Sequence, residues 1–160
     1  MSVEIIPADY GNLSHAKIII ALMDHYAQDP MGGGEPLSAY TREHLIEALA
    51  GIQGAFTLLA YADGKAVGLI NSFESFSTFN CRPLINIHDV VVLQPFRGKG
   101  IGRRLFEGVA EIARERGCCK LTLEVLEGNE NARHLYSNLG FEPYRLRPEA
   151  GAAQFWQMKL

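Results

Sequence analysis

The chain has 160 residues, enough for one compact domain with a sizeable core. Hydrophobic residues make up 48%, charged residues 21% and the net charge is −3, which excludes a disordered chain and argues against a basic nucleic-acid surface. No apolar run approaches the roughly 18 residues that cross a bilayer, and the N-terminus lacks a signal-peptide pattern. We therefore expect one cytoplasmic domain, residues 1–160, without nucleic-acid or membrane partners.

Cysteine and histidine usage predicts neither a disulfide framework nor a metal site. The three cysteines are an odd number, and Cys118 and Cys119 are adjacent, which disfavours pairing between them. The five histidines show no metal-ligand spacing among themselves or with the cysteines. We therefore expect no metal in this protein.

The N-terminal part is predicted to begin with one strand and two helices. Residues 3–6 have strand character, ended by Pro7. Apolar residues recur at helical spacing over residues 13–27 and again over residues 38–50. Between these two helices, residues 29–36 contain three glycines and predict a mobile loop.

Strands and helices alternate in the rest of the chain. Residues 55–79 predict a hairpin with Asp63-Gly64 at its turn, because this pair tolerates the positive backbone angles of a tight turn. The continuous apolar end of the next strand, residues 84–93, is typical of a strand buried on both faces. The remaining predictions are an amphipathic helix at 101–116 stopped by Gly117, a strand at 120–126, a helix at 131–139 closed by Gly140, and final strands at 141–146 and 154–160. The predicted class is mixed α+β, with a strand-helix-strand unit at its centre.

The most informative segment is the glycine turn, residues 94–105, which follows a buried strand and opens a helix. Gly98, Gly100 and Gly102 let the backbone turn sharply and approach a ligand closely. Their N–H groups and the free amides at the helix start would bind an anion, and a pyrophosphate fits best. The residues expected to bind it are Arg97, Gly98, Lys99, Gly100, Ile101, Gly102 and Arg103.

Two other phosphate motifs do not match the glycine turn. A P-loop ends in Lys-Ser or Lys-Thr, whereas Lys99 is followed by Gly100. The dinucleotide fingerprint is GxGxxG, whereas this turn has GxGxG spacing. A purely structural turn between strand and helix is the remaining alternative.

Two blocks of this sequence resemble the GNAT acetyltransferases. The run Arg97-Gly98-Lys99-Gly100-Ile101-Gly102 is similar to the family's Q/R-x-x-G-x-G/A motif, which holds the pyrophosphate of coenzyme A. Residues 124–141 are similar to the family segment N-x-x-A-x-x-x-Y-x-x-x-G-F, through Asn129, Ala132, Tyr136, Gly140 and Phe141. The resemblance covers residues 87–144, and the first eighty residues carry no diagnostic motif. It implies the GNAT fold: a twisted mixed sheet flanked by helices, with acetyl-CoA in the cleft between splayed central strands.

The resemblance also implies an activity. Acetyl-CoA would be the cosubstrate, and a primary amine would attack the thioester directly in a ternary complex. We expect the amine of a small molecule, because nothing basic or extended in the sequence indicates a peptide groove. The backbone N–H of Val91 or Val92 would face the thioester carbonyl. Tyr136 would be the general acid, although it could instead simply pack at helical spacing. Asn129 and Ala132 would contact the coenzyme, although Asn129 could instead cap the following helix.

The acceptor side is less determined by the resemblance. The segment around His88 and Asp89 is most similar to the diamine and polyamine branch, where an acidic pair often stands at these positions. Here Asp89 supplies one carboxylate of that pair, and His88 stands in place of the other. His88 could be a general base or a hydrogen-bonded core residue. The two point to opposite faces of a regular strand unless a bulge intervenes. Glu74, on the preceding strand, is a further candidate for binding the amine.

Other functions stay open at this point. The same fold could serve a non-catalytic coenzyme A sensor, or a protein or peptide N-acetyltransferase. A dehydrogenase is disfavoured by the glycine spacing. The physiological role, the acceptor amine and a possible homodimer are not determined by the sequence.

Overall fold

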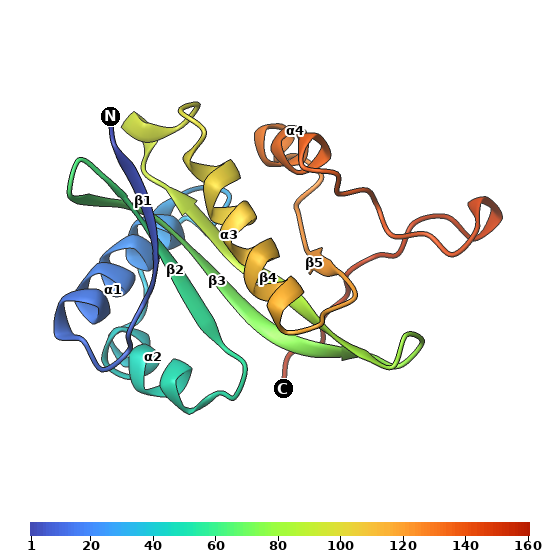
Figure 1. Ribbon diagram of the computed structural model, residues 1–160, viewed down its shortest axis with the longest axis horizontal. Helices are drawn as coiled ribbons and strands as arrows, with labels where there is room; N and C mark the ends of the chain where they lie inside the picture. The colour runs from blue at the N-terminus through green and yellow to red at the C-terminus, as the bar shows by residue number, and fades with distance from the viewer. The chain divides into compact units, whose positions relative to one another are not determined.

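The computed structural model describes residues 1–160 as two units, Met1–Leu123 and Glu124–Leu160. The first unit contains a five-stranded sheet in the order β1-β2-β3-β4-β5 (Figure 1). Its elements are β1 (Val3–Pro7), α1 (Leu13–Gln28), α2 (Ala39–Gly51), β2 (Phe56–Ala62), β3 (Lys65–Ser77), β4 (Arg82–Val92), the 3-10 turn η1 (Gln94–Phe96), α3 (Ile101–Glu115) and β5 (Leu121–Leu123).

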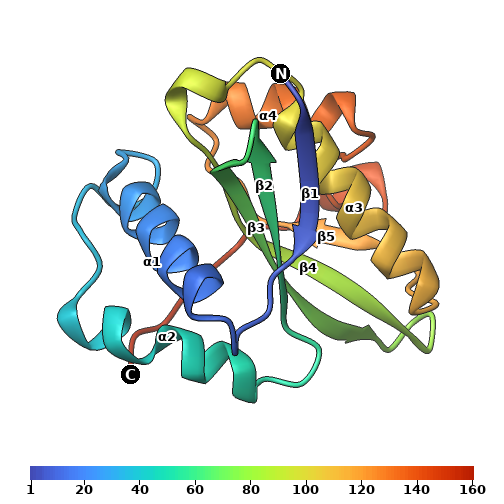
Figure 2. The same ribbon diagram turned by 60° about the vertical axis from the view of Figure 1, so that its left-hand side comes forward.

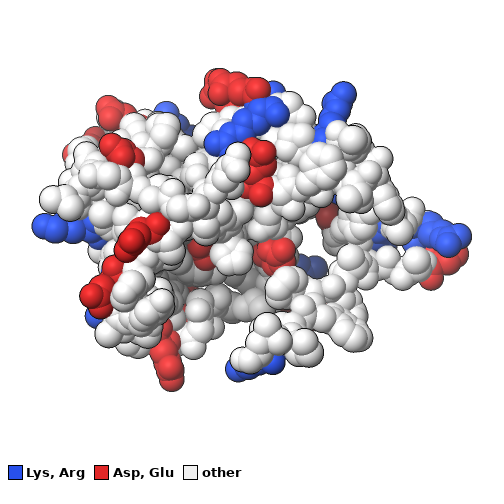
Figure 3. Space-filling model, turned by 90° about the horizontal axis from the view of Figure 1, so that it is seen from below, with Lys and Arg blue, Asp and Glu red and all other residues white.

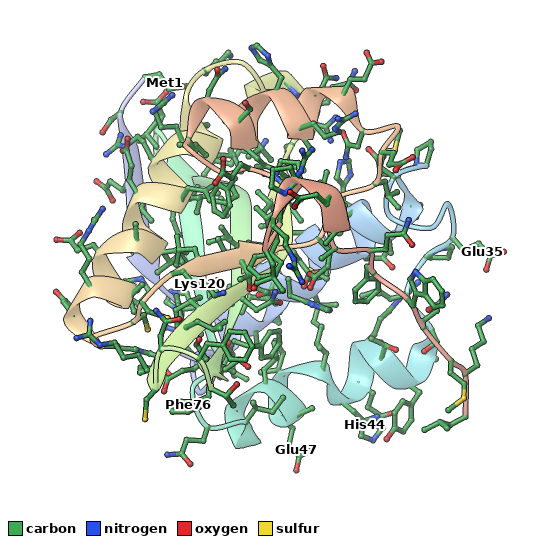
Figure 4. The ribbon with its side chains drawn as sticks, turned by 90° about the vertical axis from the view of Figure 1, so that its right-hand side faces the viewer. Met1, Glu35, His44, Glu47, Phe76 and Lys120 are labelled. Carbon is green, nitrogen blue, oxygen red and sulfur yellow. The ribbon has the colours of Figure 1, made fainter.

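The sheet is mixed, as the sequence predicted. Strands β1 to β4 pair antiparallel, whereas β5 pairs parallel to β4, because α3 crosses over between them. The β2–β3 hairpin turns at Asp63 and Gly64, whose φ angles of 48° and 78° confirm the predicted turn. Phe76 lies towards the other end of β3, at the opposite end of the sheet from Met1 (Figure 4).

Helices cover both faces of this sheet (Figure 2). On one face, Ile19 and Leu22 of α1 pack against Leu59, Leu69 and Val91, one from each of the three central strands. On the other face lies α3, and its buried stripe is Ile101, Leu105, Phe106, Val109 and Ala113. The amphipathic helix predicted at residues 101–116 is therefore confirmed, with its polar side facing solvent.

Side chains cap two of the helices of the first unit, but α3 begins differently. Asn12 accepts the N–H groups of Ser14 and His15 ahead of α1, and Ser38 accepts the N–H of Thr41 ahead of α2. Gly100 precedes α3 in a left-handed conformation and supplies no side-chain cap. The first amides of α3 are thus left for another acceptor.

The second unit contains α4 (Glu130–Asn138) and the 3-10 turn η2 (Pro148–Ala150). The strands predicted at residues 141–146 and 154–160 do not form, and this prediction was wrong. An alternating pattern needs a neighbouring strand to pair with, and Pro143 removes one donor from the first run. One backbone bond links this part of the chain, from the Ala153 N–H, just before the second run, to the Tyr144 carbonyl at 2.8 Å. Large apolar side chains of both runs are exposed: Tyr144, Leu146, Phe155, Trp156, Met158 and Leu160.

The predicted strand at residues 120–126 is shorter than expected. Only Leu121–Leu123 pair, opposite Ile85–Ile87 of β4. From residue 124 onward the chain leaves the sheet, so the alternation over the last residues of this run does not correspond to a strand. This early end of β5 leaves much of one edge of β4 open.

No helix in this protein combines the length and the apolar character needed to span a membrane. On the face drawn in Figure 3, Lys and Arg side chains are scattered among Asp and Glu and form no continuous basic stripe.

Close packing between β3 and β4 predicts a sensitive position at Gly68. A Cβ added there would stand 2.6 Å from the Val91 carbonyl oxygen, which is backbone and cannot simply rotate away. We expect Gly68→Ala to lower the free energy of unfolding by about 1–3 kcal/mol, as overpacking in a core does. Urea denaturation followed by circular dichroism measures this change.

Gly51→Ala is the matched control, because nothing lies within 4 Å of its added Cβ at the end of α2. This variant should be neutral or stabilising by up to about 1 kcal/mol. Equal unfolding midpoints for Gly68→Ala and the unchanged protein would contradict the close approach of β3 and β4.

Candidate active site

The glycine turn connects β4 to α3 at the end of the sheet that also carries the N-terminus (Figures 1 and 2). Gly98 and Gly100 have φ angles of 74° and 80°, a region that residues with a Cβ rarely adopt. An added Cβ at either position would meet nothing within 4 Å. The two glycines therefore border open space and leave room for a ligand beside the backbone.

The amides at the start of α3 face this space without acceptors of their own. The first intrahelical bond runs from the Arg104 N–H to the Gly100 carbonyl at 3.1 Å. The preceding N–H groups of Ile101, Gly102 and Arg103 have no carbonyl one turn earlier to receive them. The positive end of the helix dipole lies at the same point, so this site favours an anion such as a diphosphate.

Of the basic side chains in the glycine turn, Arg97 makes the most contacts. Its Nε donates to the Val92 carbonyl at 2.9 Å, and its guanidinium lies 3.5 Å from the Asp29 carboxylate. Lys99 lies over the Phe96 ring, 5.3 Å from its centroid. Arg103 is exposed on the first turn of α3. Arg97 thus links the glycine turn by a hydrogen bond to the end of β4 and by an ion pair to the loop that follows α1.

The strand register decides which amides at the end of β4 are free. The Leu93 N–H donates to the Val67 carbonyl at 2.9 Å, and the pairing of Val91 with Leu69 follows in regular antiparallel order. Hydrogen-bonded and non-hydrogen-bonded pairs alternate in such a ladder. The N–H of Val91 therefore points to β3, and that of Val92 points away, to the edge that β5 leaves open after Ile87.

A bulge places His88 and Asp89 on the same face of the sheet. Asn71 of β3 pairs with Asp89, but the next residue, Ser72, pairs with Ile87, so His88 is the extra residue. The His88 ring packs edge-on against Phe73, 5.6 Å between centroids. Phe73 and Asn71 are two residues apart on one strand and share a face. The His88 and Asp89 side chains can therefore serve one site. This is the case of a bulge, which the sequence analysis allowed as an exception.

Polar groups from α1 and β3 surround Asp89. The Asn71 Nδ2 donates to Asp89 Oδ2 at 2.9 Å and also lies 3.3 Å from the Met23 sulfur. Burial raises the pKa of the Tyr26 hydroxyl, and the Asp89 and Asp29 carboxylates raise it further. Tyr26 therefore remains protonated at neutral pH and can donate a hydrogen bond beside these carboxylates.

Glu74 is not brought together with His88 and Asp89. It lies one residue beyond Phe73, on the opposite face of β3, where its carboxylate pairs with Arg116 at 3.1 Å. Burial, together with the Glu74 charge, raises the pKa of the neighbouring Cys118 thiol. This thiol is therefore a poor nucleophile at neutral pH. No three His, Cys, Asp or Glu side chains approach closely enough to hold a metal ion.

The second unit carries the other residues that the sequence analysis selected. The Asn129 side chain accepts the Ala132 N–H at 3.2 Å, so it caps α4. Tyr136 is half-buried on α4, and its ring lies 6.1 Å from that of Phe141. The spacing of the second block thus corresponds to one capped helix and the turn that follows it.

Sequence reasoning missed Tyr26, Thr57 and Asn71. The signal for Asn71 was present, because a polar residue inside an otherwise apolar strand needs a partner. Thr57 and Tyr26 carry no such signal, since each fits its strand or helix as an ordinary residue. A groove of about 700 Å³ between α1 and α2 was also not expected, and none of the selected residues lines it.

The sequence model of the acetyltransferase (GNAT) family matches residues 19–141. Thialysine N-epsilon-acetyltransferase of Bos taurus is 42% identical over 68 residues, which are 42% of this chain and 39% of that protein. Streptothricin acetyltransferase of Streptomyces lavendulae is 44% identical over 80 residues, which are 50% of this chain and 40% of that protein.

N-alpha-acetyltransferase MAK3 of Arabidopsis thaliana is 30% identical over 138 residues, which are 86% of this chain and 66% of that protein. The chain thus spans about two fifths to two thirds of the length of these relatives. The solved structure of AAC(6')-Iy with a bisubstrate analogue, CoA-S-monomethyl-acetylneamine, superposes with a TM-score of 0.76 at 18% identity, covering 100% of both chains. That structural likeness shows a shared fold. With the family match over residues 19–141, we conclude that this chain belongs to the acetyltransferase (GNAT) family.

Proposed function

We propose that this protein is an acetyl-CoA-dependent N-acetyltransferase, acting as one domain, that acetylates the primary amine of a small molecule. The observation that carries the proposal is the glycine turn, where unpaired amides at the start of α3 face open space beside Gly98 and Gly100. The family match and relatives named for acetylating thialysine and streptothricin support the same reaction class. When bound, acetyl-CoA supplies an acetyl group activated as a thioester.

The chain's own groups suit the binding of this cosubstrate. The amides from Ile101 to Arg103 would hold the diphosphate, and Lys99 and Arg103 would add positive charge. The Val92 N–H points to the open edge of β4 and is our candidate donor to the thioester oxygen. By the family motif, Asn129 and Ala132 would contact the coenzyme, although the Asn129 side chain also caps α4.

The acceptor amine would bind beside Asp89 and His88. Asp89 would attract the ammonium form, and His88 would take the proton that the amine must lose before it attacks. The bulge at His88 supports these two roles, because it presents the His88 and Asp89 side chains on one face of the sheet. Tyr136 would return a proton to the leaving thiolate, in the role of the family tyrosine at this position. Attack would be direct, which agrees with the raised pKa of the Cys118 thiol.

A peptide acceptor is the competing proposal, favoured by the match to N-alpha-acetyltransferase MAK3 over 86% of the chain. Thiol release from acetyl-CoA should be measured with diamines, amino acids, aminoglycosides and short peptides as acceptors. Turnover with small amines and none with peptides supports our proposal. The reverse result supports the peptide function, and coenzyme binding without any turnover supports a sensor.

The first prediction from this proposed function concerns Gly100. Gly100→Asp should weaken acetyl-CoA binding by about 100-fold or more, because a like charge would face the diphosphate. Gly100→Asn is the matched control, since Asn tolerates the same left-handed conformation without the charge. Its affinity for acetyl-CoA should fall only about tenfold. Calorimetric titration gives both affinities. Equal affinities for Asp and Asn would show that no phosphate lies there.

The second prediction concerns Tyr136. Tyr136→Phe should lower kcat by about 10- to 100-fold, because the hydroxyl proton is lost, while acetyl-CoA affinity changes little. Tyr40→Phe, on the exposed side of α2, is the control and should keep kcat unchanged. Steady-state kinetics and coenzyme titration separate the two parameters. An unchanged kcat in Tyr136→Phe would remove it as the acid.

The third prediction concerns His88. A base must be unprotonated to act, so kcat/KM for the amine should fall as the pH is lowered. His88→Gln should lower the plateau by about 10- to 100-fold and flatten this acidic limb. The measurement is the pH–rate profile for the amine. The same profile in both proteins would eliminate this histidine as the base.

A further inference from the structure

A chain of hydrogen bonds crosses the sheet and ends on Asp89. The Tyr10 hydroxyl lies 2.9 Å from Thr57 Oγ1, which donates to Asn71 Oδ1 at 2.6 Å. Asn71 Nδ2 then donates to Asp89 Oδ2 at 2.9 Å. The two middle members are almost fully buried, with 1% of Thr57 and 3% of Asn71 exposed.

The strand register explains why these side chains meet. Thr57 pairs with Asn71 across β2 and β3, and Asn71 pairs with Asp89 across β3 and β4. Directly opposed residues of neighbouring strands share a face and lie within contact distance. The hydrogen bonds therefore follow one row of opposed residues across the strands, on the face of the sheet that α1 covers.

All the donors in this row point towards the carboxylate. Thr57 has one hydroxyl proton and gives it to Asn71, so Tyr10 must be the donor in its bond with Thr57. Burial raises the pKa of the Tyr10 hydroxyl, and its bond to Thr57 only partly offsets this. Tyr10 therefore keeps its proton at neutral pH. Hydrogen bonds aligned head to tail polarise one another, which strengthens the last bond to Asp89.

We propose that Asn71 and Thr57 are positioning residues for Asp89. They hold the Asp89 carboxylate by Oδ2. The other oxygen, Oδ1, has no hydrogen bond within the protein and is left to receive the ammonium group of the acceptor amine. This inference rests on the proposed acetyltransferase function. Most buried side chains of this sheet are apolar, and Thr57 and Asn71 are both hydrogen-bonded although they are buried.

The first test compares Thr57→Val with Thr57→Ser. Valine keeps the branched shape and the strand preference but removes the hydroxyl, so kcat/KM for the amine should fall about 3- to 10-fold, mainly through KM. Serine restores the hydroxyl and should recover most of the loss. The KM for acetyl-CoA should stay within about twofold in both. An unchanged amine KM in Thr57→Val, or equal changes for amine and acetyl-CoA, would overturn the proposal.

Ser77→Ala is the control for loss of a buried hydroxyl on β3. Its hydroxyl bonds to Asn80 at 3.2 Å near the end of β3, outside the row. Kinetics of this variant should match those of the unchanged protein. Thermal unfolding of all variants separates a loss of stability from a loss of amine binding.

The second test is a double-mutant cycle between Asn71→Leu and Asp89→Asn. If Asn71 acts through Asp89, Asn71→Leu alone should lower kcat/KM for the amine by about 10- to 30-fold. In the Asp89→Asn background the same substitution should lower it by less than about threefold. Multiplicative effects would mean independent roles and would overturn the proposal. No turnover of any amine by the unchanged protein would refute the proposed function and this inference together. Turnover with multiplicative effects would refute the inference alone.

Discussion

Unequal pairing of β4 with its two neighbours is the constraint on which the rest of this structure depends. On one side β4 is paired with β3 through to its last residue, Val92, with one bulge. On the other side β5 pairs only with Ile85–Ile87. Backbone groups beyond Ile87 on that side therefore face an open edge, and the Val92 carbonyl there receives Arg97 from the glycine turn. An open edge inside a sheet is costly unless a ligand or side chain binds to it, so this edge is a natural place for a binding site.

The bulge at His88 has a second consequence for the same strand. A regular strand would have placed His88 and Asp89 on opposite faces, and only one of them could have belonged to the proposed acceptor site. The extra residue brings both to the face covered by α1, where Asn71 holds one carboxylate oxygen of Asp89. Bulges are common beside active sites because they redirect side chains without ending the strand. This single irregularity thus brings both residues of the proposed acceptor site to one face of β4.

The charges around Asp29 and Asp89 are arranged unevenly. Asp29 is paired with Arg97 and its other oxygen accepts the Met31 N–H, so its charge is largely engaged. Asp89 has one oxygen bound by a neutral amide and the other without a hydrogen bond. Asp89 is therefore the carboxylate better able to attract a cationic amine. The pairing of Asp29 with Arg97 also joins the loop after α1 to the glycine turn, and thus the two halves of the proposed site.

Much of the fold and the glycine turn could be predicted from the sequence, because these features are local. Helix periodicity, the Asp63-Gly64 turn and the glycine turn depend on residues close together in the chain, and all are found. The final strands could not be predicted, because a strand needs a partner that local alternation does not specify, and residues 141–146 and 154–160 form no strand. The choice between Val91 and Val92, the bulge at His88 and the row from Tyr10 to Asp89 were also decided only by the tertiary structure. Each depends on register between strands that are distant in sequence, and register is set by the packing of whole faces rather than by any single residue.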